Sequence, residues 1–264
     1  MLPFGITDLE FSLVTLVSAF VGIALITGLS RWVSARLLAA FALGVYFWYF
    51  TDTLAGANYL DVNSGFSLSV GLVSLVLLFV VGLFVFFGVG GGIFSGESAG
   101  ATGMFVALLA ALALGIHGMA EGADFGFTAS QTPSSTILDA FGGLAPSVSW
   151  VLHKMLEPTA AAACYVALTG HGNKNASGRM FDALTLSVVF VTPAVVGSIA
   201  GYFTPINTTY LYALGLGTSV YALAWVGKAL YAPVAGNQSW LSMKVAAAVL
   251  LGFLFIFISA LLHS

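Results

Sequence analysis

The sequence predicts an all-α integral membrane protein, a single domain of eight transmembrane helices, and three observations carry that prediction. Of the 264 residues, 59% are hydrophobic and only 6% are charged, whereas a soluble domain typically carries about 25% charged residues. The mean hydropathy is +1.04. Apolar stretches of about 20 residues, the length that crosses a bilayer as a helix, recur along the chain. The short segments between them are rich in Gly, Pro, Asn and Ser, which favour turns.

The expected spans fill one domain, residues 1–264, and lie at 9–29, 34–55, 65–88, 103–128, 141–169, 180–203, 208–231 and 240–262. Apart from Lys154, which lies inside a span, the basic residues sort to one end of this arrangement: Arg31, Arg36, Lys174, Arg179, Lys228 and Lys244. Four acidic residues sort to the other end: Asp8, Glu10, Asp61 and Asp139. Because basic segments stay in the cytoplasm, both termini are expected on the non-cytoplasmic side of a cell membrane.

Two stretches of the chain resemble one another, 39–50 in the second expected span and 212–225 in the seventh. Each has a run of Ala and Leu, then Gly44 or Gly217, then hydroxyl-bearing and aromatic residues. Similar segments in the second and second-to-last spans favour two inverted three-helix halves around a central pair, a 3+2+3 arrangement. Two glycine pairs with GxxxG spacing are candidates for close helix contacts: Gly118/Gly122 and Gly197/Gly201.

The ionisable residues inside the apolar stretches concentrate in the fourth and fifth spans. Such a group at the bilayer centre costs about 3 kcal/mol on the insertion scale, so these groups are expected to face inward and to pair or bind a cation. His117 and Glu121 stand four residues apart and share a helix face, and His153 and Glu157 repeat that spacing in the next span. Two imidazoles and two carboxylates around one point suit a tetrahedral divalent ion such as Zn²⁺.

Four further residues are expected to shape this site. Pro158 lacks an amide proton and clashes with the carbonyl of Lys154, so it should kink the fifth span beside the site. Asp124 lies near Glu121 along the same helix face and is expected in a vestibule, and Asp52 is expected at its entrance. The Lys154 ammonium would offset part of the carboxylate charge and would also oppose an incoming cation.

The residues leave alternatives to a metal site. The same groups could form a polar network that only holds two helices together. A zinc hydrolase would need a carboxylate left free as general base, which a four-ligand site does not leave, so an enzyme is not expected. A Schiff base on Lys154 does not fit eight spans with a proline nearby. The net charge of −3 gives no reason to expect a nucleic-acid partner.

At these residues the sequence resembles the ZIP family of divalent-metal transporters, over most of the chain. "HGMAEG" (117–122) resembles the family's fourth-span motif His-Asn-x-x-(Glu/Asp)-Gly. "HKMLEP" (153–158) keeps the first and fifth positions of fifth-span motifs such as His-Asn-x-Pro-Glu-Gly, and "TPAVVGSIAG" (192–201) is similar to the sixth-span motif in its proline and glycines. The resemblance implies eight spans, both termini outside, inverted halves and transport of a divalent metal.

The resemblance also implies which metal ligands the chain retains. The first of two adjacent metal sites in the family would use His117, Glu121, His153 and Glu157. The second draws on positions that are here Gly118, Lys154 and Thr192, none of which is a normal metal ligand. We therefore expect transport of a zinc-like cation through one intramembrane site, with the metal as substrate and no tightly bound cofactor. The alternative is a transport-inactive structural or regulatory subunit, and a homodimer or a partner in a membrane complex fits both functions.

Overall fold

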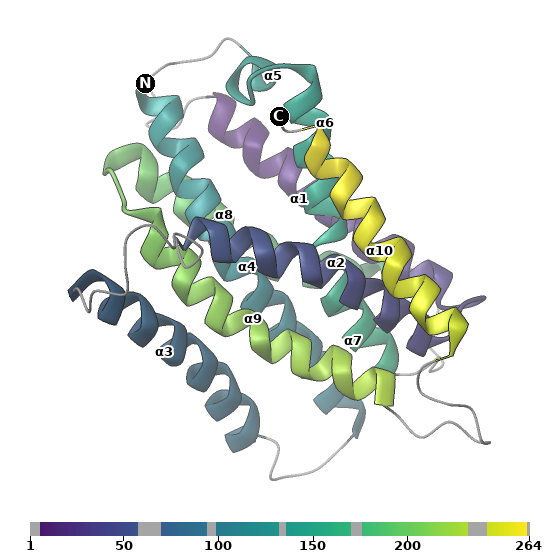
Figure 1. Ribbon diagram of the computed structural model, residues 1–264. Coiled ribbons are helices and arrows are strands. Elements are labelled where there is room, and N and C mark those ends of the chain that lie inside the picture. The colour runs from purple at the N-terminus through teal and green to yellow at the C-terminus, as the bar shows by residue number, and fades with distance from the viewer. Residues whose placement is uncertain are drawn as a thin grey trace.

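The computed structural model describes residues 6–57, 70–93, 99–131, 136–169, 176–231 and 242–262. Within these ranges the chain consists of α-helices joined by turns and contains no strand (Figure 1). The helices are α1 (Ile6–Leu29), α2 (Ala35–Gly56), α3 (Val70–Ile93), α4 (Ala99–Gln131), α5 (Ile137–Ala140), α6 (Leu144–Leu156), α7 (Thr159–Thr169), α8 (Ala176–Phe203), α9 (Thr208–Tyr231) and α10 (Met243–Leu261).

Among the described residues, seven helices are long and apolar enough to cross a membrane: α1, α2, α3, α4, α8, α9 and α10. Their outer faces carry large exposed apolar side chains such as Leu9, Phe84 and Phe255. Apolar surface on this scale is unusual for a protein that water surrounds. The chain therefore has the character of a multi-pass helical integral membrane protein.

The helix directions give the bundle two distinct ends. α1 begins and α10 ends at the same end of the bundle, which we call the terminal end (Figure 1). We call the other end the basic end, because the helix termini there carry Arg31, Arg36, Arg179, Lys228 and Lys244. Two charged residues used in the sequence prediction, Asp61 and Lys174, lie outside the described residues.

The stretch predicted as the fifth span, 141–169, is not one continuous helix. α6 ends at Leu156 and α7 begins at Thr159, so each piece is shorter than the other long helices. The break falls at Pro158, where the sequence predicts a kink, because proline cannot donate the next helical hydrogen bond. The Glu157 N–H still donates to the His153 carbonyl at 3.0 Å, and the pattern resumes beyond the proline. The third predicted span also differs: its first residues, 65–69, lie outside the described residues, and α3 continues to Ile93.

The centre of the bundle lies around α4 and α7. Eight consecutive residues of α7, from Thr159 to Val166, are buried, and α4 packs against α7, α8 and α9. α3 lies at the edge of the bundle and packs mainly against α9 (Figure 1). His117 of α4 and Lys154 of α6 are buried in this part of the bundle.

Glycine sets the close approach of α4 and α8. A Cβ on Gly122 would overlap the Ala194 carbonyl of α8, and Gly197 and Gly201 stand in the same way against backbone carbonyls of α4. Gly118 is different, because a Cβ there would meet the Ala194 side chain at 3.3 Å and Glu121 Oε2 at 3.7 Å, and it would come no nearer than 4.0 Å to backbone, at Ala194 Cα. Three of the four glycines in the predicted GxxxG pairs are thus close-contact positions.

Two other crossings use glycine in matching ways. In the α2–α10 crossing, Gly44 faces α10 backbone and Gly252 faces α2 backbone. In the α3–α9 crossing, Gly217 faces α3 backbone and Gly82 faces α9 backbone. Gly44 and Gly217, which the sequence comparison aligned, therefore have the same role in two separate helix pairs.

Candidate metal centre

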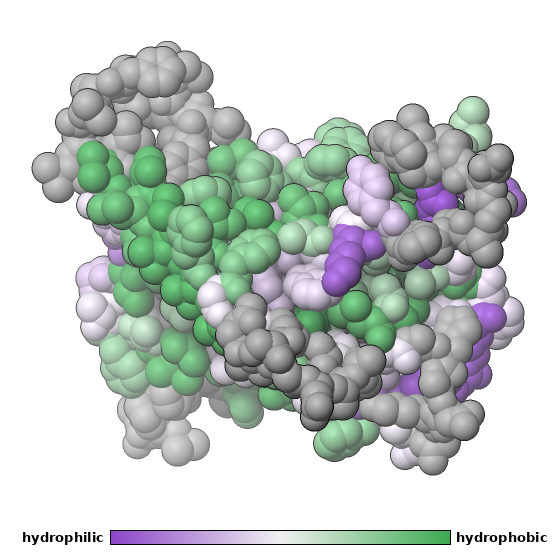
Figure 2. All heavy atoms as spheres, turned by 90° about the horizontal axis from the view of Figure 1, so that it is seen from below, coloured by the Kyte–Doolittle hydropathy of each residue, from purple (hydrophilic) through white to green (hydrophobic). Residues whose placement is uncertain are grey.

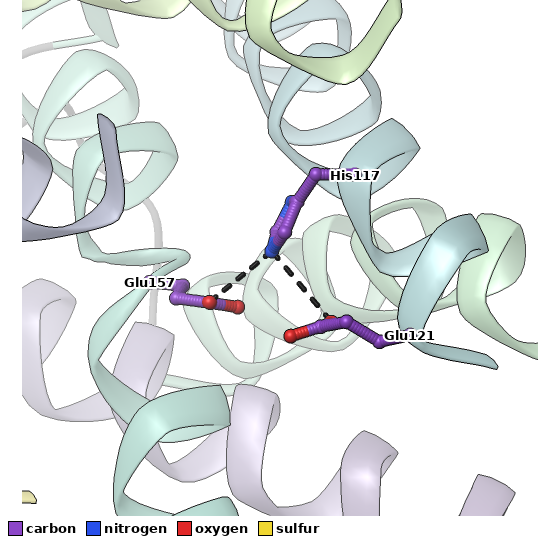
Figure 3. Close-up of side chains that lie close together, drawn as sticks. All are labelled: His117, Glu121 and Glu157. Atoms are coloured by element: carbon purple, nitrogen blue, oxygen red, sulfur yellow. Dashed lines mark hydrogen bonds and ion pairs between the residues drawn. The ribbon is translucent and has the colours of Figure 1, made fainter. Parts of the chain in front are cut away.

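Three side chains of metal-ligand type converge between α4 and the break that separates α6 from α7. His117 and Glu121 lie one turn apart on α4, and Glu157 lies at the break. Their side chains point toward one another (Figure 3), and each offers a ligand atom within 4.8 Å of the others. His117 Nε2 lies 3.1 Å from Glu157 Oε1 and 3.7 Å from Glu121 Oε2. A tetrahedral Zn²⁺ with bonds of about 2.1 Å holds its donors about 3.4 Å apart, so these donors need little movement to share one ion.

The Lys154 ammonium lies among the same three side chains. Its Nζ donates to Glu157 Oε2 at 2.7 Å and to Glu121 Oε2, and it contacts His117 Nε2 at 3.5 Å. An ammonium has three N–H donors and no acceptor, so three acceptors can satisfy it although its side chain is only 1% exposed. The ammonium therefore stands where a metal ion held by these ligands would stand.

The surroundings of His117 fix its orientation. Its Nδ1 donates to the Leu114 carbonyl, which can only accept, so Nε2 is the nitrogen that faces the carboxylates. The Tyr49 ring stands edge-on to the imidazole at a centroid distance of 4.5 Å. Gly215 of α9 packs against the His117 backbone, where a Cβ would lie 2.7 Å from His117 Cα. A hydrogen bond to the second ring nitrogen is the usual way to orient a ligating histidine.

His153 lies at the rim of this group. Its Nε2 is 3.3 Å from Glu157 Oε1, and it lines a cavity of about 420 Å³ together with Glu121, Asp124 and Asp52. Trp48, Ser149, Trp150, Tyr212 and Ala260 complete the lining. Both aspartates are exposed, so the cavity connects the buried group to the outside through an acidic vestibule.

The structure brings together most of the residues that the sequence selects. His117, Glu121 and Glu157 form the ligand group, Lys154 pairs with both glutamates, and His153 touches it from the rim. Asp124 and Asp52 line the vestibule, and Pro158 lies at the helix break. Thr192 occupies one of the positions that would belong to the second metal site of the family. It is exposed on α8 and donates to the Val188 carbonyl at 2.7 Å, so it does not reach His117, Glu121 and Glu157.

Sequence reasoning missed two aromatic residues of the site. The Lys154 Nζ lies 4.9 Å from the centre of the Trp150 ring, and an aromatic face attracts a nearby cation. Trp150 precedes Lys154 by four residues, so helical spacing places the two side chains on one face. This contact could therefore have been predicted from the sequence. Tyr49 comes from the distant helix α2, and no spacing in the sequence connects it with His117.

When the sequence is compared with protein-family models and with curated proteins, nothing matches. The resemblance to the ZIP family therefore rests on the motifs alone and stays a prediction.

Proposed function

We propose that this chain moves a divalent metal cation such as Zn²⁺ across a membrane, through one intramembrane site formed by His117, Glu121 and Glu157, with His153 as a fourth group at the rim. The observation that carries the proposal is the convergence of ligand atoms of His117, Glu121 and Glu157 within 4.8 Å, inside a bundle of apolar helices. Imidazole and carboxylate together are the ligand set that Zn²⁺ and similar ions use. An intramembrane cluster of this kind commonly marks an ion pathway.

The vestibule supports a cationic substrate. Asp52, Asp124 and Glu121 line it, and they lead from exposed positions to the buried ligands. Acidic groups in a cavity with low-dielectric walls raise the local concentration of cations. The vestibule therefore favours entry of a metal ion and disfavours an anionic substrate.

Lys154 sets the cost of metal entry in this proposal. With Glu121, Glu157 and Lys154 ionised, the group carries a net charge of −1, and without the lysine it would carry −2. The ammonium stabilises the metal-free site, because two buried carboxylates close together would otherwise repel one another. An arriving metal must displace the ammonium, and the lysine re-occupies the site when the metal leaves.

Alternating access of the site would follow from two inverted halves, α1–α3 and α8–α10, that move against the central helices. The matching glycine crossings of α2 with α10 and of α9 with α3 support this arrangement. Tyr46 and Ser219, each two residues beyond one of the aligned glycines, hydrogen-bond one another at 2.9 Å. In proteins with two inverted repeats, equivalent residues meet in this way near the twofold axis that relates the repeats. In this arrangement α6 and α7 together would form one further membrane crossing, the eighth.

One observation favours a second candidate function. The ammonium satisfies both glutamates and lies within 3.5 Å of the His117 nitrogen, so the group is complete without a metal. The chain would then be a transport-inactive subunit in which Lys154 replaces the cation permanently. That function predicts a stoichiometric protein partner and no metal flux.

The test is metal uptake into proteoliposomes that contain the purified protein and a metal-sensitive dye. We expect Zn²⁺ or Cd²⁺ uptake by the wild type and loss of uptake in Glu157→Gln, which keeps the size of the side chain and removes its charge. Asp139→Asn, a change at an exposed acidic residue outside the site, serves as the matched control and should leave uptake unchanged. Equal uptake by wild type and Glu157→Gln would refute the proposal, and a wild type with no flux and a co-purifying subunit would establish the second candidate.

A further inference from the structure

We propose that an anionic phospholipid occupies the groove between α1, α2 and α10, and that its acyl chain packs against the break between α6 and α7. The groove has a volume of about 550 Å³ and opens on the side of the bundle, and it is apolar almost throughout. Met155, Leu156 and Thr159, which flank the break, form its floor. The proposal concerns a second ligand and holds whether or not the buried site carries a metal.

The dimensions of the groove fit one acyl chain in one leaflet. Along α10 it runs from Lys244 to Phe255, which is about 16 Å at 1.5 Å per residue. Half the hydrocarbon thickness of a bilayer is about 15 Å. The groove therefore begins at the membrane surface on the basic end and ends near the middle of the membrane, at the level of the helix break.

The charge at the mouth of the groove selects an anionic headgroup. Lys244 lines the mouth and is exposed, and Arg31 and Arg36 stand in sequence on either side of Val33, another lining residue. Trp32, in the same turn, is 79% exposed, and tryptophan prefers the headgroup level of a membrane. Figure 2, the view from below, shows a largely hydrophobic surface on which the strongly hydrophilic residues lie near the centre and at the right of the picture. Basic pockets between transmembrane helices are typical binding sites for anionic lipid headgroups.

Two other apolar grooves lack this feature. The groove between α2, α9 and α10 has a similar volume, about 560 Å³, and the groove between α1 and α8 has about 330 Å³. No charged side chain is among the described residues that line either of them. Ordinary lipid can cover these two surfaces without selection by charge. Of these three grooves in the described part of the chain, the one with Lys244 combines a chain-length trough with a cation at its mouth.

The acyl chain would pack against Met155, Leu156 and Thr159, beside the interruption of the helix. Pro158 has no N–H, so the helical bond to the Lys154 carbonyl is missing, and the two helix pieces are not joined by it. Gly22 of α1 already packs against the Met155 carbonyl at the edge of this floor. A bound chain would fix the width of the groove at this point and hold α6 and α7 in their present relation.

The experiment measures lipid retention by native mass spectrometry of the whole protein, with phosphatidylglycerol and phosphatidylcholine offered in equal amounts. Two adjacent exposed alanines on α10 provide a matched pair, because Ala247 lines the proposed groove and Ala246 lines the uncharged one. Lys244→Gln tests the headgroup contact, with Lys228→Gln, an exposed lysine at the same end, as its control. Circular dichroism and thermal unfolding establish that each variant is folded.

We expect the wild type to retain phosphatidylglycerol in preference to phosphatidylcholine. Lys244→Gln should lower that retention about fivefold, Ala247→Trp should abolish it, and Ala246→Trp and Lys228→Gln should match the wild type. Phosphatidylglycerol should also raise the unfolding temperature of the wild type and of Ala246→Trp but not of Ala247→Trp. Equal retention of both lipids, or equal retention by the two tryptophan variants, overturns the proposal. A wild-type dimer that Ala247→Trp disrupts also overturns it, because the groove would then be an interface between two copies.

Discussion

At the scale of single residues, the position of Lys154 makes the strongest prediction. Its ammonium contacts the three side chains that would hold a metal, so Lys154→Met should remove the competing cation and keep a side chain of similar length. Without metal, the free energy of unfolding should fall by about 3–5 kcal/mol, since the variant leaves buried carboxylates unpaired. Metal affinity should rise about tenfold or more, and added Cd²⁺ should restore much of the lost stability. Calorimetric titration and thermal unfolding measure both effects.

The control for this variant is Lys228→Met. Lys228 is exposed on α9 and lies over the Trp225 ring at 4.3 Å, remote from the ligand group. Neither metal affinity nor metal-dependent stability should change there. If Lys154→Met bound metal no better than the wild type, the ammonium would not be a competitor for this site.

The two histidines that the sequence treats as equivalent have different positions, and this difference is testable. His117 is buried and belongs to the ligand group, whereas His153 contacts only Glu157 within the group and lines the vestibule. We expect His153→Gln to weaken metal binding roughly 10–100-fold, as loss of an outer partner does. His117→Gln should weaken it further. Titration of both variants with metal gives their dissociation constants and shows which variant binds metal more weakly. Equal losses of metal affinity would show that His153 is a ligand of the same rank as His117.

The ligand group itself could be read from the sequence, because helical spacing and the cost of buried charge both act locally. His117 and Glu121 stand four residues apart and so share one helix face. That face turns inward because ionisable groups are costly in lipid. The contacts of the Lys154 ammonium with Glu121 and Glu157 could not be predicted from the sequence, because they depend on the position of α6 relative to α4. The Tyr49 and Gly215 contacts with His117 join three separate helices, and only the packed bundle defines them.

At the scale of helices, Gly122 and Gly118 form a matched pair on α4. Gly122→Ala would place its Cβ against the Ala194 carbonyl of α8, a backbone atom that cannot move aside, so α4 and α8 must separate. We expect a loss of about 1–3 kcal/mol in the free energy of unfolding. Gly118→Ala places its Cβ 3.3 Å from the Ala194 methyl group and 3.7 Å from Glu121 Oε2, with no close backbone contact. This change should be close to neutral, because alanine also favours the helix. Denaturant unfolding in detergent compares the two, and equal destabilisation would show that Gly118 is also a close-contact position.

The bounds of a helix could be predicted where they follow from the length of an apolar stretch alone. The expected spans at 9–29 and 208–231 correspond to α1 and α9 with ends within a few residues. The interruption at Pro158 was predictable in kind, since proline always removes a helical hydrogen bond. The relative placement of α6 and α7 was not predictable, because it depends on the packing of α7 against α2, α4 and α9.

At the scale of the whole molecule, the number of membrane crossings depends on α6 and α7. Seven of the described helices satisfy the length and hydropathy of a span. The broken pair adds an eighth crossing only if α6 begins and α7 ends on opposite faces of the membrane. By the positive-inside rule, we then expect the basic end to lie in the cytoplasm. The sequence predicts this topology through charge, which does not depend on the exact helix boundaries.

Cysteine labelling from each side of the membrane tests this topology. The wild type has only Cys164, which is fully buried and should not react, so Cys164→Ala provides a silent background. Leu144→Cys at the start of α6, 70% exposed in the wild type, should react with an impermeant maleimide on intact cells. Ser177→Cys at the start of α8 and Trp32→Cys after α1, both exposed positions, should react only after permeabilisation. If Leu144→Cys and Ser177→Cys react from the same side, α6 and α7 form a re-entrant pair and the chain crosses the membrane seven times; if all three reverse, the orientation is inverted.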